Sequence, residues 1–360
     1  ATRVLVYPGQ ADGSFANSYN FDLFWNQGLT FTAADFTGDG KLDLAVTHRF
    51  GMTEILRGNP PTGFVRTGTI PNQQLSRGIA VDLDDNGTAE LLLPGAGATG
   101  LQLVAMNSLG VPAGAAAYGI PPNGNLYPDY DPARSSASVA DFDSDGRADV
   151  ALIAPVVAGG VLQVFSASGP AAPLNFSAFA GGRISITQMY AADFTGDGKP
   201  DIIALDADSS SLLLFRNLGQ NRFAAAVATP LSAVARCLLV ADFNNDSRPD
   251  LAIGLGSAVP NSGKLEIRYN NAGDFSQVQT INTGAIPFRL ATADFNGDFK
   301  TDLVYIPVSD SGGAPAGLVL NQTNNVFLPQ RTLTLPAYSS LGNVGLAGAI
   351  QTGDVNGDGA

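Results

Sequence analysis

The chain of 360 residues is poor in the residues that build most catalytic and redox centres. It contains one cysteine, one histidine and one tryptophan, and charged residues make up only 14% of it. The single cysteine, Cys237, excludes an internal disulfide and a metal site made of several thiolates, and the single histidine, His48, excludes a centre with several histidine ligands. Only 19 residues are basic and 32 are acidic, so the net charge is −13. The sequence therefore lacks the clustered cations that nucleic-acid binding requires.

Long apolar runs and helical patterns are also missing from the sequence. The longest apolar run, around Val150–Leu162, contains Pro155 and two glycines and is too short to span a bilayer, so we expect no membrane insertion. No apolar stripe with a helical period extends over ten residues. Because 45% of the residues are hydrophobic, the chain is nevertheless too apolar to be disordered.

A nine-residue acidic pattern recurs seven times and divides the chain into repeats. The copies begin 47 to 60 residues apart, at Asp35, Asp82, Asp141, Asp193, Asp242, Asp294 and Asp354. Each of the first six copies is followed by a β-rich run, such as Asp43–His48 or Asp201–Asp206, and a second run usually follows about ten residues later. Four short strands in a repeat of about 50 residues are typical of a β-propeller blade.

Two other repeat architectures fit less well. The repeats of a linear β-solenoid are usually shorter, and about 50 residues are too few to close the core of a β-sandwich. We therefore predict an all-β fold, a seven-bladed β-propeller with four-stranded antiparallel blades, as a single domain over residues 1–360. Arg3–Tyr7 and about Leu346–Gly353 look like complementary parts of one repeat, so we expect them to share the seventh blade and the natural chain to continue past residue 360.

The acidic pattern has the chemistry of a loop that binds a hard cation. Positions 1, 3, 5 and 9 carry oxygen-bearing side chains, and position 6 is glycine in most copies. The spacing resembles the start of an EF-hand loop, in which position 7 adds a backbone carbonyl, and Ca²⁺ prefers six to eight oxygen ligands. The candidate ligands, including the backbone carbonyls of position 7, are Asp35, Thr37, Asp39, Lys41 and Asp43; Asp82, Asp84, Asn86, Thr88 and Glu90; Asp141, Asp143, Asp145, Arg147 and Asp149; Asp193, Thr195, Asp197, Lys199 and Asp201; Asp242, Asn244, Asp246, Arg248 and Asp250; Asp294, Asn296, Asp298, Lys300 and Asp302; and Asp354, Asn356 and Asp358.

Turn formation alone is the alternative explanation, because Asp, Asn and Gly are common in turns. It does not explain why 21 of the 32 acidic residues occupy these positions, where like charges repel unless a cation lies between them. We therefore predict several Ca²⁺ ions, up to six or seven, and expect the loop of Asp141, with four carboxylates, to bind most tightly. Position 6 is Ser247 in one copy and Phe299 in another, and this phenylalanine must adopt an unfavourable positive φ or change the shape of its loop.

The repeated motif resembles the FG-GAP/VCBS-type repeat, the unit of integrin α-subunit propellers and of many secreted or surface bacterial proteins. The resemblance covers nearly the whole chain and is strongest in Ala151–Phe165 and Leu251–Asn270. It implies calcium in the loops and a secreted or cell-surface location. It does not assign one function, since similar repeats serve adhesion, sugar binding and lyase scaffolds.

We expect a non-catalytic binding or adhesion module for an extracellular carbohydrate or protein, acting as a monomer. The alternatives are a polysaccharide lyase or other sugar-active enzyme on a propeller scaffold, and a purely structural module. An apparent irregular insertion over Val111–Arg134 is the candidate ligand-binding segment, because binding residues often lie on loops. Its candidate residues are Tyr118, Tyr127, Asp129 and Tyr130. Cys237 is expected to be a buried packing residue and His48 a surface or hydrogen-bonded residue without a catalytic role, and no catalytic residue is predicted.

Overall fold

In the computed structural model, all the regular secondary structure of the described residues consists of antiparallel β-strands. The residues described are 3–6, 19–23, 28–48, 52–59, 63–71, 78–83, 86–94, 100–119, 136–156, 159–165, 174–180, 185–257, 259, 261–307, 316–322, 326–328 and 331–333. This part of the chain contains no helical segment with the length and apolarity needed to cross a lipid bilayer.

Six four-stranded sheets, here called blades 1 to 6, follow one another along the sequence. Blade 1 consists of β3 (Gly28–Ala34), β4 (Asp43–His48), β5 (Met52–Gly58) and β6 (Phe64–Pro71), and blade 2 of β7 (Ile79–Val81), β8 (Glu90–Pro94), β9 (Gly100–Met106) and β10 (Pro112–Gly119). Blade 3 consists of β11 (Ala137–Ala140), β12 (Asp149–Val156), β13 (Gly159–Phe165) and β14 (Leu174–Ala180), and blade 4 of β15 (Ile186–Ala192), β16 (Asp201–Asp206), β17 (Ser211–Phe215) and β20 (Val227–Pro230). Blade 5 consists of β21 (Ala235–Ala241), β22 (Asp250–Leu255), β23 (Gly263–Asn271) and β24 (Asp274–Gly284), and blade 6 of β25 (Pro287–Ala293), β26 (Asp302–Pro307), β27 (Ala316–Val319) and β30 (Arg331–Leu333).

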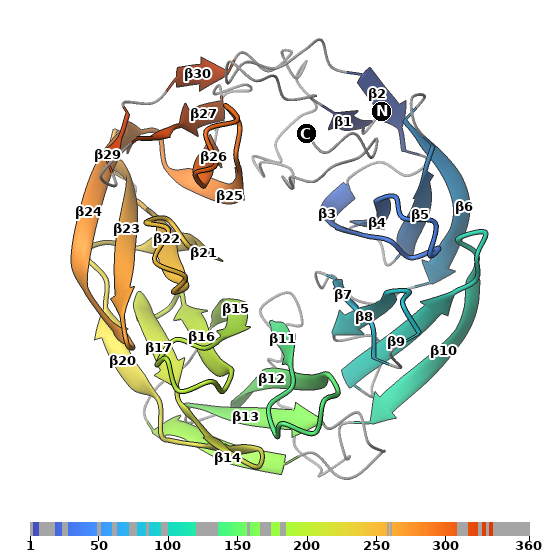
Figure 1. Ribbon diagram of the computed structural model, residues 1–360, viewed down its shortest axis with the longest axis horizontal. Coiled ribbons are helices and arrows are strands. Elements are labelled where there is room, and N and C mark those ends of the chain that lie inside the picture. Colours follow the sequence, from blue (N-terminus) through green and yellow to red (C-terminus); the bar gives the residue numbers. More distant parts are fainter. Residues whose placement is uncertain are drawn as a thin grey trace.

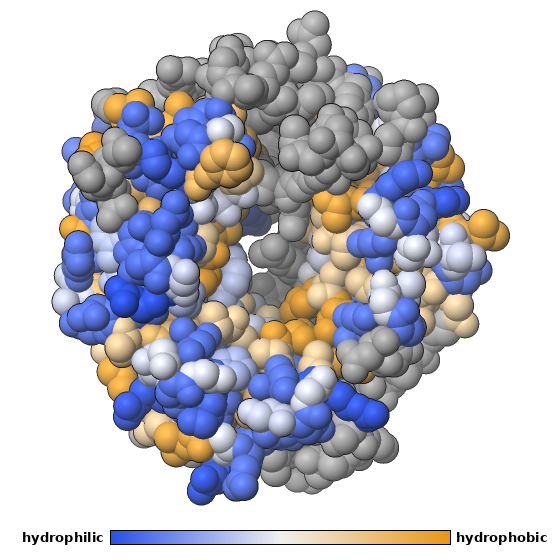
Figure 2. All heavy atoms as spheres, in the orientation of Figure 1, coloured by the Kyte–Doolittle hydropathy of each residue, from blue (hydrophilic) through white to orange (hydrophobic). Residues whose placement is uncertain are grey.

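The blades are arranged in a ring, with the first strand of each blade innermost and the fourth outermost (Figure 1). Short hairpins connect the third and fourth strands of blades 4 and 6, formed by β18 (Asn217–Gly219) with β19 (Arg222–Phe223) and by β28 (Asn321–Gln322) with β29 (Val326–Phe327). Hydrophilic residues dominate the blade faces seen in Figure 2, and hydrophobic residues gather on the inner side of blades 1 and 2. The chain is therefore a β-propeller, as the repeat length predicts.

The predicted number of seven four-stranded blades is corrected by the structure, in which the described residues form six. Between blades 6 and 1 lies a two-stranded hairpin of β1 (Arg3–Val6) and β2 (Tyr19–Asp22). The expected partner segment, Leu346–Gly353, lies outside the described residues, so its place in a seventh blade stays a prediction. The two numbers differ because the sequence prediction counts copies of the acidic motif, whereas a complete blade requires four paired strands.

The β1–β2 hairpin packs against blade 1 as one blade packs against the next. Val4, Val6 and Phe21 join a hydrophobic cluster with the blade 1 residues Leu44 and Leu56. Arg66 of β6 adds a polar contact, since it donates a hydrogen bond of 3.3 Å to the carbonyl of Asp22 and lies over the ring of Phe21. The hairpin thus occupies the ring position expected for the outer half of a further blade.

The hydrophobic core lies between adjacent blades rather than within one layer. Every residue of the second strands β4, β16 and β22 is buried, because a neighbouring blade, or for one face of β4 the β1–β2 hairpin, packs against each face. One cluster joins blades 3 and 4, and others join blades 4 and 5 and blades 5 and 6. Burial on both faces explains why these strands read as continuous apolar runs.

Position 2 of the acidic pattern supplies a core residue at these interfaces. Phe142, Phe194 and Phe243 are at most 1% exposed, and each meets a phenylalanine of the following blade edge to face. The partners are Phe223, Phe275 and Phe327, at ring-centroid distances of 5.5, 5.9 and 5.9 Å. Each acidic loop is therefore anchored in the interface with the next blade.

The replacement Phe194→Ala tests this anchor. Loss of a fully buried phenylalanine should lower the free energy of unfolding by about 3–5 kcal/mol, through lost burial and the cavity that remains. Urea-induced unfolding monitored by circular dichroism measures the change. Leu218→Ala is the control, since Leu218 is 51% exposed and its replacement should change stability by less than about 0.5 kcal/mol. Equal effects of the two replacements would contradict the interblade anchor.

Candidate metal-binding loops

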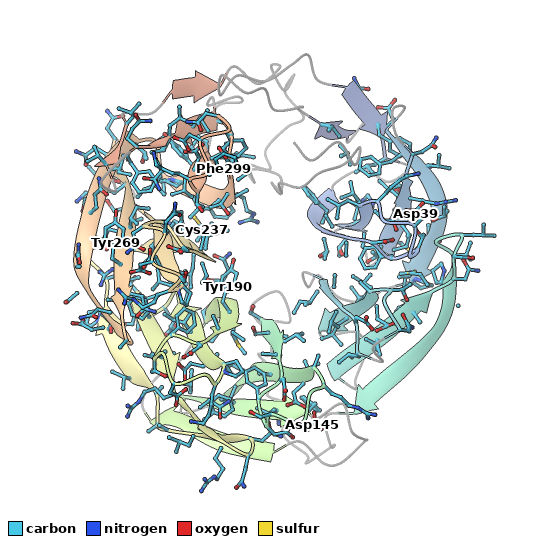
Figure 3. All side chains as sticks on the ribbon, viewed as in Figure 1. Asp39, Asp145, Tyr190, Cys237, Tyr269 and Phe299 are labelled. Carbon is cyan, nitrogen blue, oxygen red and sulfur yellow. The ribbon has the colours of Figure 1, made fainter. Side chains whose placement is uncertain are left out.

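Six of the seven acidic loops connect the first and second strands of blades 1 to 6. Position 9 of the pattern begins the second strand, so the motif bridges two strands of one blade. Asp39 of blade 1 and Asp145 of blade 3 lie far apart in the ring, and the loops therefore form separate sites (Figure 3). Asp354, Asn356 and Asp358 of the seventh loop, and Asp84 of the second, lie outside the described residues.

The carboxylate at position 1 organises each described loop. In the loop of Asp193, one carboxylate oxygen accepts backbone N–H bonds from Gly196 and Asp197, and the other accepts one from Gly198 at 2.8 Å. The bonds from positions 5 and 6 recur in all six described loops. Position 1 therefore fixes the turn and keeps only part of its acceptor capacity for a cation.

Position 6 has a positive φ in every described loop. The glycines Gly40, Gly87, Gly146 and Gly198 have φ values of 77°, 84°, 89° and 82°. Ser247 and Phe299 adopt 66° and 62°, and the amide of Phe299 makes the same bond to position 1 as the glycines do. Phe299 thus accepts the unfavourable φ and the loop keeps its shape, although its side chain is 90% exposed.

Position 5 accepts a backbone N–H bond from position 7 in the same six loops. Its side chain also pairs with a cation in several of them, as in Asp197–Lys199 at 2.8 Å and Asp246–Arg248 at 2.6 Å. The hydrogen bond from Lys199 lowers the pKa of Asp197. In the loop of Asp141, no ion pair joins the corresponding residues Asp145 and Arg147, both of which are described. That loop consequently keeps its position 5 carboxylate without a lysine or arginine from position 7.

Position 9 is a buried aspartate or glutamate in all six described loops. Asp250 accepts N–H bonds from Phe243 at 3.0 Å and from Asn270 at 2.7 Å, which tie position 2 to the end of the third strand. Asp43, Asp201 and Asp302 make equivalent pairs of bonds. Burial raises the pKa of Asp250 and Asp302 to about 6, and the nearby loop carboxylates add to the shift. Position 9 therefore holds the loop to the third strand through hydrogen bonds and is also a candidate metal ligand.

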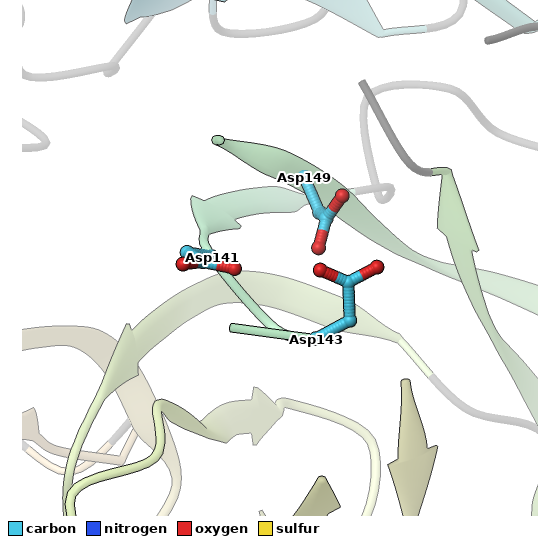
Figure 4. A group of neighbouring side chains, drawn as sticks. All are labelled: Asp141, Asp143 and Asp149. Atoms are coloured by element: carbon cyan, nitrogen blue, oxygen red, sulfur yellow. The ribbon is translucent and has the colours of Figure 1, made fainter. Parts of the chain in front are cut away.

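One described loop brings three carboxylates together. Asp141, Asp143 and Asp149 each offer an oxygen, and these oxygens lie within 4.8 Å of one another (Figure 4). Two ligands on opposite sides of a Ca²⁺ ion are about 4.8 Å apart, because each bond is about 2.4 Å long. Position 3 is threonine or asparagine in four other described loops, and that of the second loop, Asp84, lies outside the described residues. Among the described residues, no other loop brings three carboxylates this close together.

Each of three loops is capped by an asparagine of the next blade, which the sequence analysis missed. Asn217, Asn270 and Asn321 are buried at the ends of third strands and donate to the carbonyls of Phe142, Phe194 and Phe243 at 2.9, 3.0 and 2.7 Å. The available signal was an Asn five or six residues before a Phe in three repeats. Its meaning depends on a neighbour about 75 residues away.

The prediction that Val111–Arg134 is irregular is corrected in its first part, and its role in ligand binding stays a prediction. Pro112–Gly119 is β10, the fourth strand of blade 2, and pairs regularly with β9 apart from one bulge. The backbone of Tyr118 belongs to this strand. Tyr127, Asp129 and Tyr130 lie outside the described residues, so their role stays a prediction.

Cys237 is buried, as predicted, and His48 is also buried rather than on the surface. Nε2 of His48 lies 3.1 Å from Oε1 of Glu54, whose other oxygen accepts a bond from Arg66 at 3.0 Å. Burial lowers the pKa of His48 and raises that of Cys237 to about 12. Neither side chain is presented to solvent.

Comparison with known proteins agrees with this architecture. Residues 193–253 match the family model of the FG-GAP-like repeat, and residues 133–164 match that of the FG-GAP repeat. No curated protein matches the chain.

Solved structures share the fold at low sequence identity. A functionally unknown protein from Desulfotomaculum acetoxidans DSM 771 is 11% identical with a TM-score of 0.57, over 91% of each chain. BBS1N in complex with ARL6DN, soaked with lead, is 12% identical with a TM-score of 0.54, over 86% of this chain and 84% of that chain. The same complex soaked with mercury is 14% identical with the same TM-score, over 86% and 85%. These likenesses concern the fold alone.

The replacement Phe299→Gly tests the strain at position 6. Relief of the positive φ should raise the free energy of unfolding by up to about 1 kcal/mol, because the exposed ring contributes little packing. Gly198→Ala is the matched reverse change, since a Cβ there meets nothing within 4 Å and should lower stability by about 1 kcal/mol through strain alone. Thermal unfolding of both variants measures the effects. A destabilised Phe299→Gly protein would show that the phenylalanine stabilises the fold.

Proposed function

Because this chain is an FG-GAP repeat β-propeller protein, we propose that it is a calcium-stabilised, secreted or cell-surface binding module without catalytic activity of its own. The observation that carries the proposal is the trio of Asp141, Asp143 and Asp149, whose oxygens lie within 4.8 Å of one another. Three carboxylates at that separation repel one another and favour a bound cation.

The donor set fits calcium rather than a softer metal. The described loops offer carboxylate, amide, hydroxyl and backbone oxygens, and they contain neither histidine nor cysteine. Oxygen-only sites suit hard cations such as Ca²⁺. In the loop of Asp141, the ion would be held by the side chains of positions 1, 3, 5 and 9 and by the carbonyl of Arg147.

Calcium would supply positive charge at places where the fold concentrates negative charge. The buried carboxylate of position 9 ties the acidic loop to the end of the third strand of its own blade, so neutralising the charges near it should stabilise that blade. Loops with a lysine or arginine paired to position 5 should bind more weakly, because that cation competes for the same carboxylate. Affinities in the millimolar class are typical of extracellular modules, and we propose the same class for these loops.

The ligand is proposed to be an extracellular carbohydrate or protein that contacts the face carrying the acidic loops. Phe299 supports this choice, because it is strained and 90% exposed and so contributes neither packing nor a relaxed backbone. Leu109 and Leu218 are also exposed and lie in connections between third and fourth strands, which in an antiparallel blade end on the same side as the connections between first and second strands. Aromatic side chains surrounded by polar groups are frequent anchors in binding sites. The solved propeller BBS1N is in complex with a protein, ARL6DN.

The enzyme alternative would need a base other than His48. A lyase needs an accessible base near a metal, whereas His48 is buried next to Glu54.

Calcium removal tests the first part of the proposal. Several sites that bind only the folded state should together stabilise it by several kcal/mol in excess calcium, so EDTA should lower the Tm and added calcium should restore it. Differential scanning calorimetry with elemental analysis of the dialysed protein measures both quantities. Magnesium at equal ionic strength is the control for a general salt effect. An unchanged Tm with no bound metal would refute the calcium proposal.

Photocrosslinking tests the binding face. Replacement of Phe299 by p-benzoylphenylalanine keeps an aromatic side chain, and irradiation with the culture medium or cell surface should give a calcium-dependent adduct identified by mass spectrometry. The same residue at Val227, exposed on outer strand β20, is the control. A glycan array read with and without EDTA covers carbohydrate ligands. Identical adducts at both positions, with no array signal, would contradict the assigned face.

A further inference from the structure

One residue of blade 4 contacts the acidic loop of blade 3. Asn221, in the hairpin between β18 and β19, is 5% exposed. Its side-chain Nδ2 donates a hydrogen bond of 2.8 Å to Oδ2 of Asp143, a member of the carboxylate trio. The two residues are separated by 78 positions in the sequence, so only the closed packing of the two blades brings them together.

The amide oxygen of the same side chain is buried and has no hydrogen-bond partner among the described residues. A buried acceptor left without a donor destabilises a folded protein by about 1–3 kcal/mol. Asn221 also has a φ of 53°, in the left-handed region. This φ, like that of 56° at Gln220, is the one that a two-residue β-hairpin turn requires, and asparagine tolerates it. The structure thus holds an unsatisfied oxygen on a side chain whose other polar atom is bonded to one of the three carboxylates.

A cation would satisfy this arrangement. Amide carbonyl oxygens are ordinary Ca²⁺ ligands, and the amide nitrogen of Asn221 is already bonded to a carboxylate of the site. Resting on the calcium binding proposed above, we infer that the site of the Asp141 loop is shared between two blades. Asn221 orients Asp143 through Nδ2 and provides an oxygen ligand from blade 4.

The interface between blades 4 and 5 has no residue in the role of Asn221 among those described. In the turn of blade 5 that covers the loop of Asp193, Gly273 faces Thr195 and offers no side-chain oxygen. The loop of Asp193 therefore lacks a described equivalent of Asn221. Calcium at the Asp141 loop should stabilise the docking of blade 4 on blade 3, because the same hairpin carries Asn217 and Phe223, which hold Phe142.

Three single variants of the full chain separate a metal role from a packing role. Asn221→Ala removes the amide, Asn221→Asp keeps an oxygen, and Gln220→Ala changes the adjacent exposed residue, whose φ of 56° is similar. Each is made again in a background in which Asp141→Asn and Asp145→Asn weaken the loop. The probe is calcium alone, and the readouts are the Tm in EDTA and its dependence on calcium concentration.

We expect Asn221→Ala to weaken calcium binding at this site about tenfold or more, as removal of groups that hold metal ligands commonly does. Gln220→Ala should respond to calcium nearly as the native chain does. Asn221→Asp keeps a ligand oxygen but loses the N–H donor to Asp143 and adds a negative charge, so it should have a lower Tm in EDTA and still bind calcium more tightly than Asn221→Ala. In the weakened-loop background, Asn221→Ala should have no further effect on the calcium response.

Two results would overturn the inference while leaving the proposed function standing. One is an unchanged calcium response of Asn221→Ala in a chain that does bind calcium, and the other is an equal loss in the weakened-loop background. A native chain whose Tm is the same in EDTA and in calcium would overturn both the inference and the calcium proposal.

Discussion

The fold depends on the insertion of one loop phenylalanine into the interface with the following blade. Phe142, Phe194 and Phe243 are buried there, and their backbone carbonyls are capped by an asparagine from the neighbour. A blade of four short strands buries too little surface to be stable alone, so repeat architectures obtain their core by packing units together. The phenylalanine places that contact at the same position in each of these seams.

The phenylalanine follows directly after the first acidic residue of the loop, so the polar site and the core anchor belong to one short segment. The buried carboxylate at position 9 joins them, because it bonds to the amide of the phenylalanine and to the end of the third strand, as Asp250 does with Phe243 and Asn270. Charge at the loop and packing between blades are consequently coupled through the backbone. This coupling gives a physical reason for an acidic loop to recur at the same place in successive blades.

The described loops are similar in shape but differ in charge. Position 1 organises the turn in all six through backbone hydrogen bonds, and even Phe299 adopts the φ that glycine has elsewhere. What varies is position 3 and the cation at position 7. Only the loop of Asp141, among those described, combines a position 3 carboxylate with a position 5 carboxylate that has no ion pair to position 7. The described loops thus share one backbone conformation and differ in the charges that their side chains carry.

The sequence by itself determined the strand runs, the repeat length, the propeller class and the position of the acidic loops, because these follow from local patterns of apolar, turn-forming and charged residues. It did not determine the number of complete blades, and it misread Pro112–Gly119 as an insertion, since an outer strand of small residues lacks a strong apolar alternation. Only the tertiary structure showed that Asn217 caps Phe142 and that Asn221 meets Asp143. Those contacts join residues about 75 positions apart, and the geometry of blade packing, which no local pattern encodes, decides which of them meet.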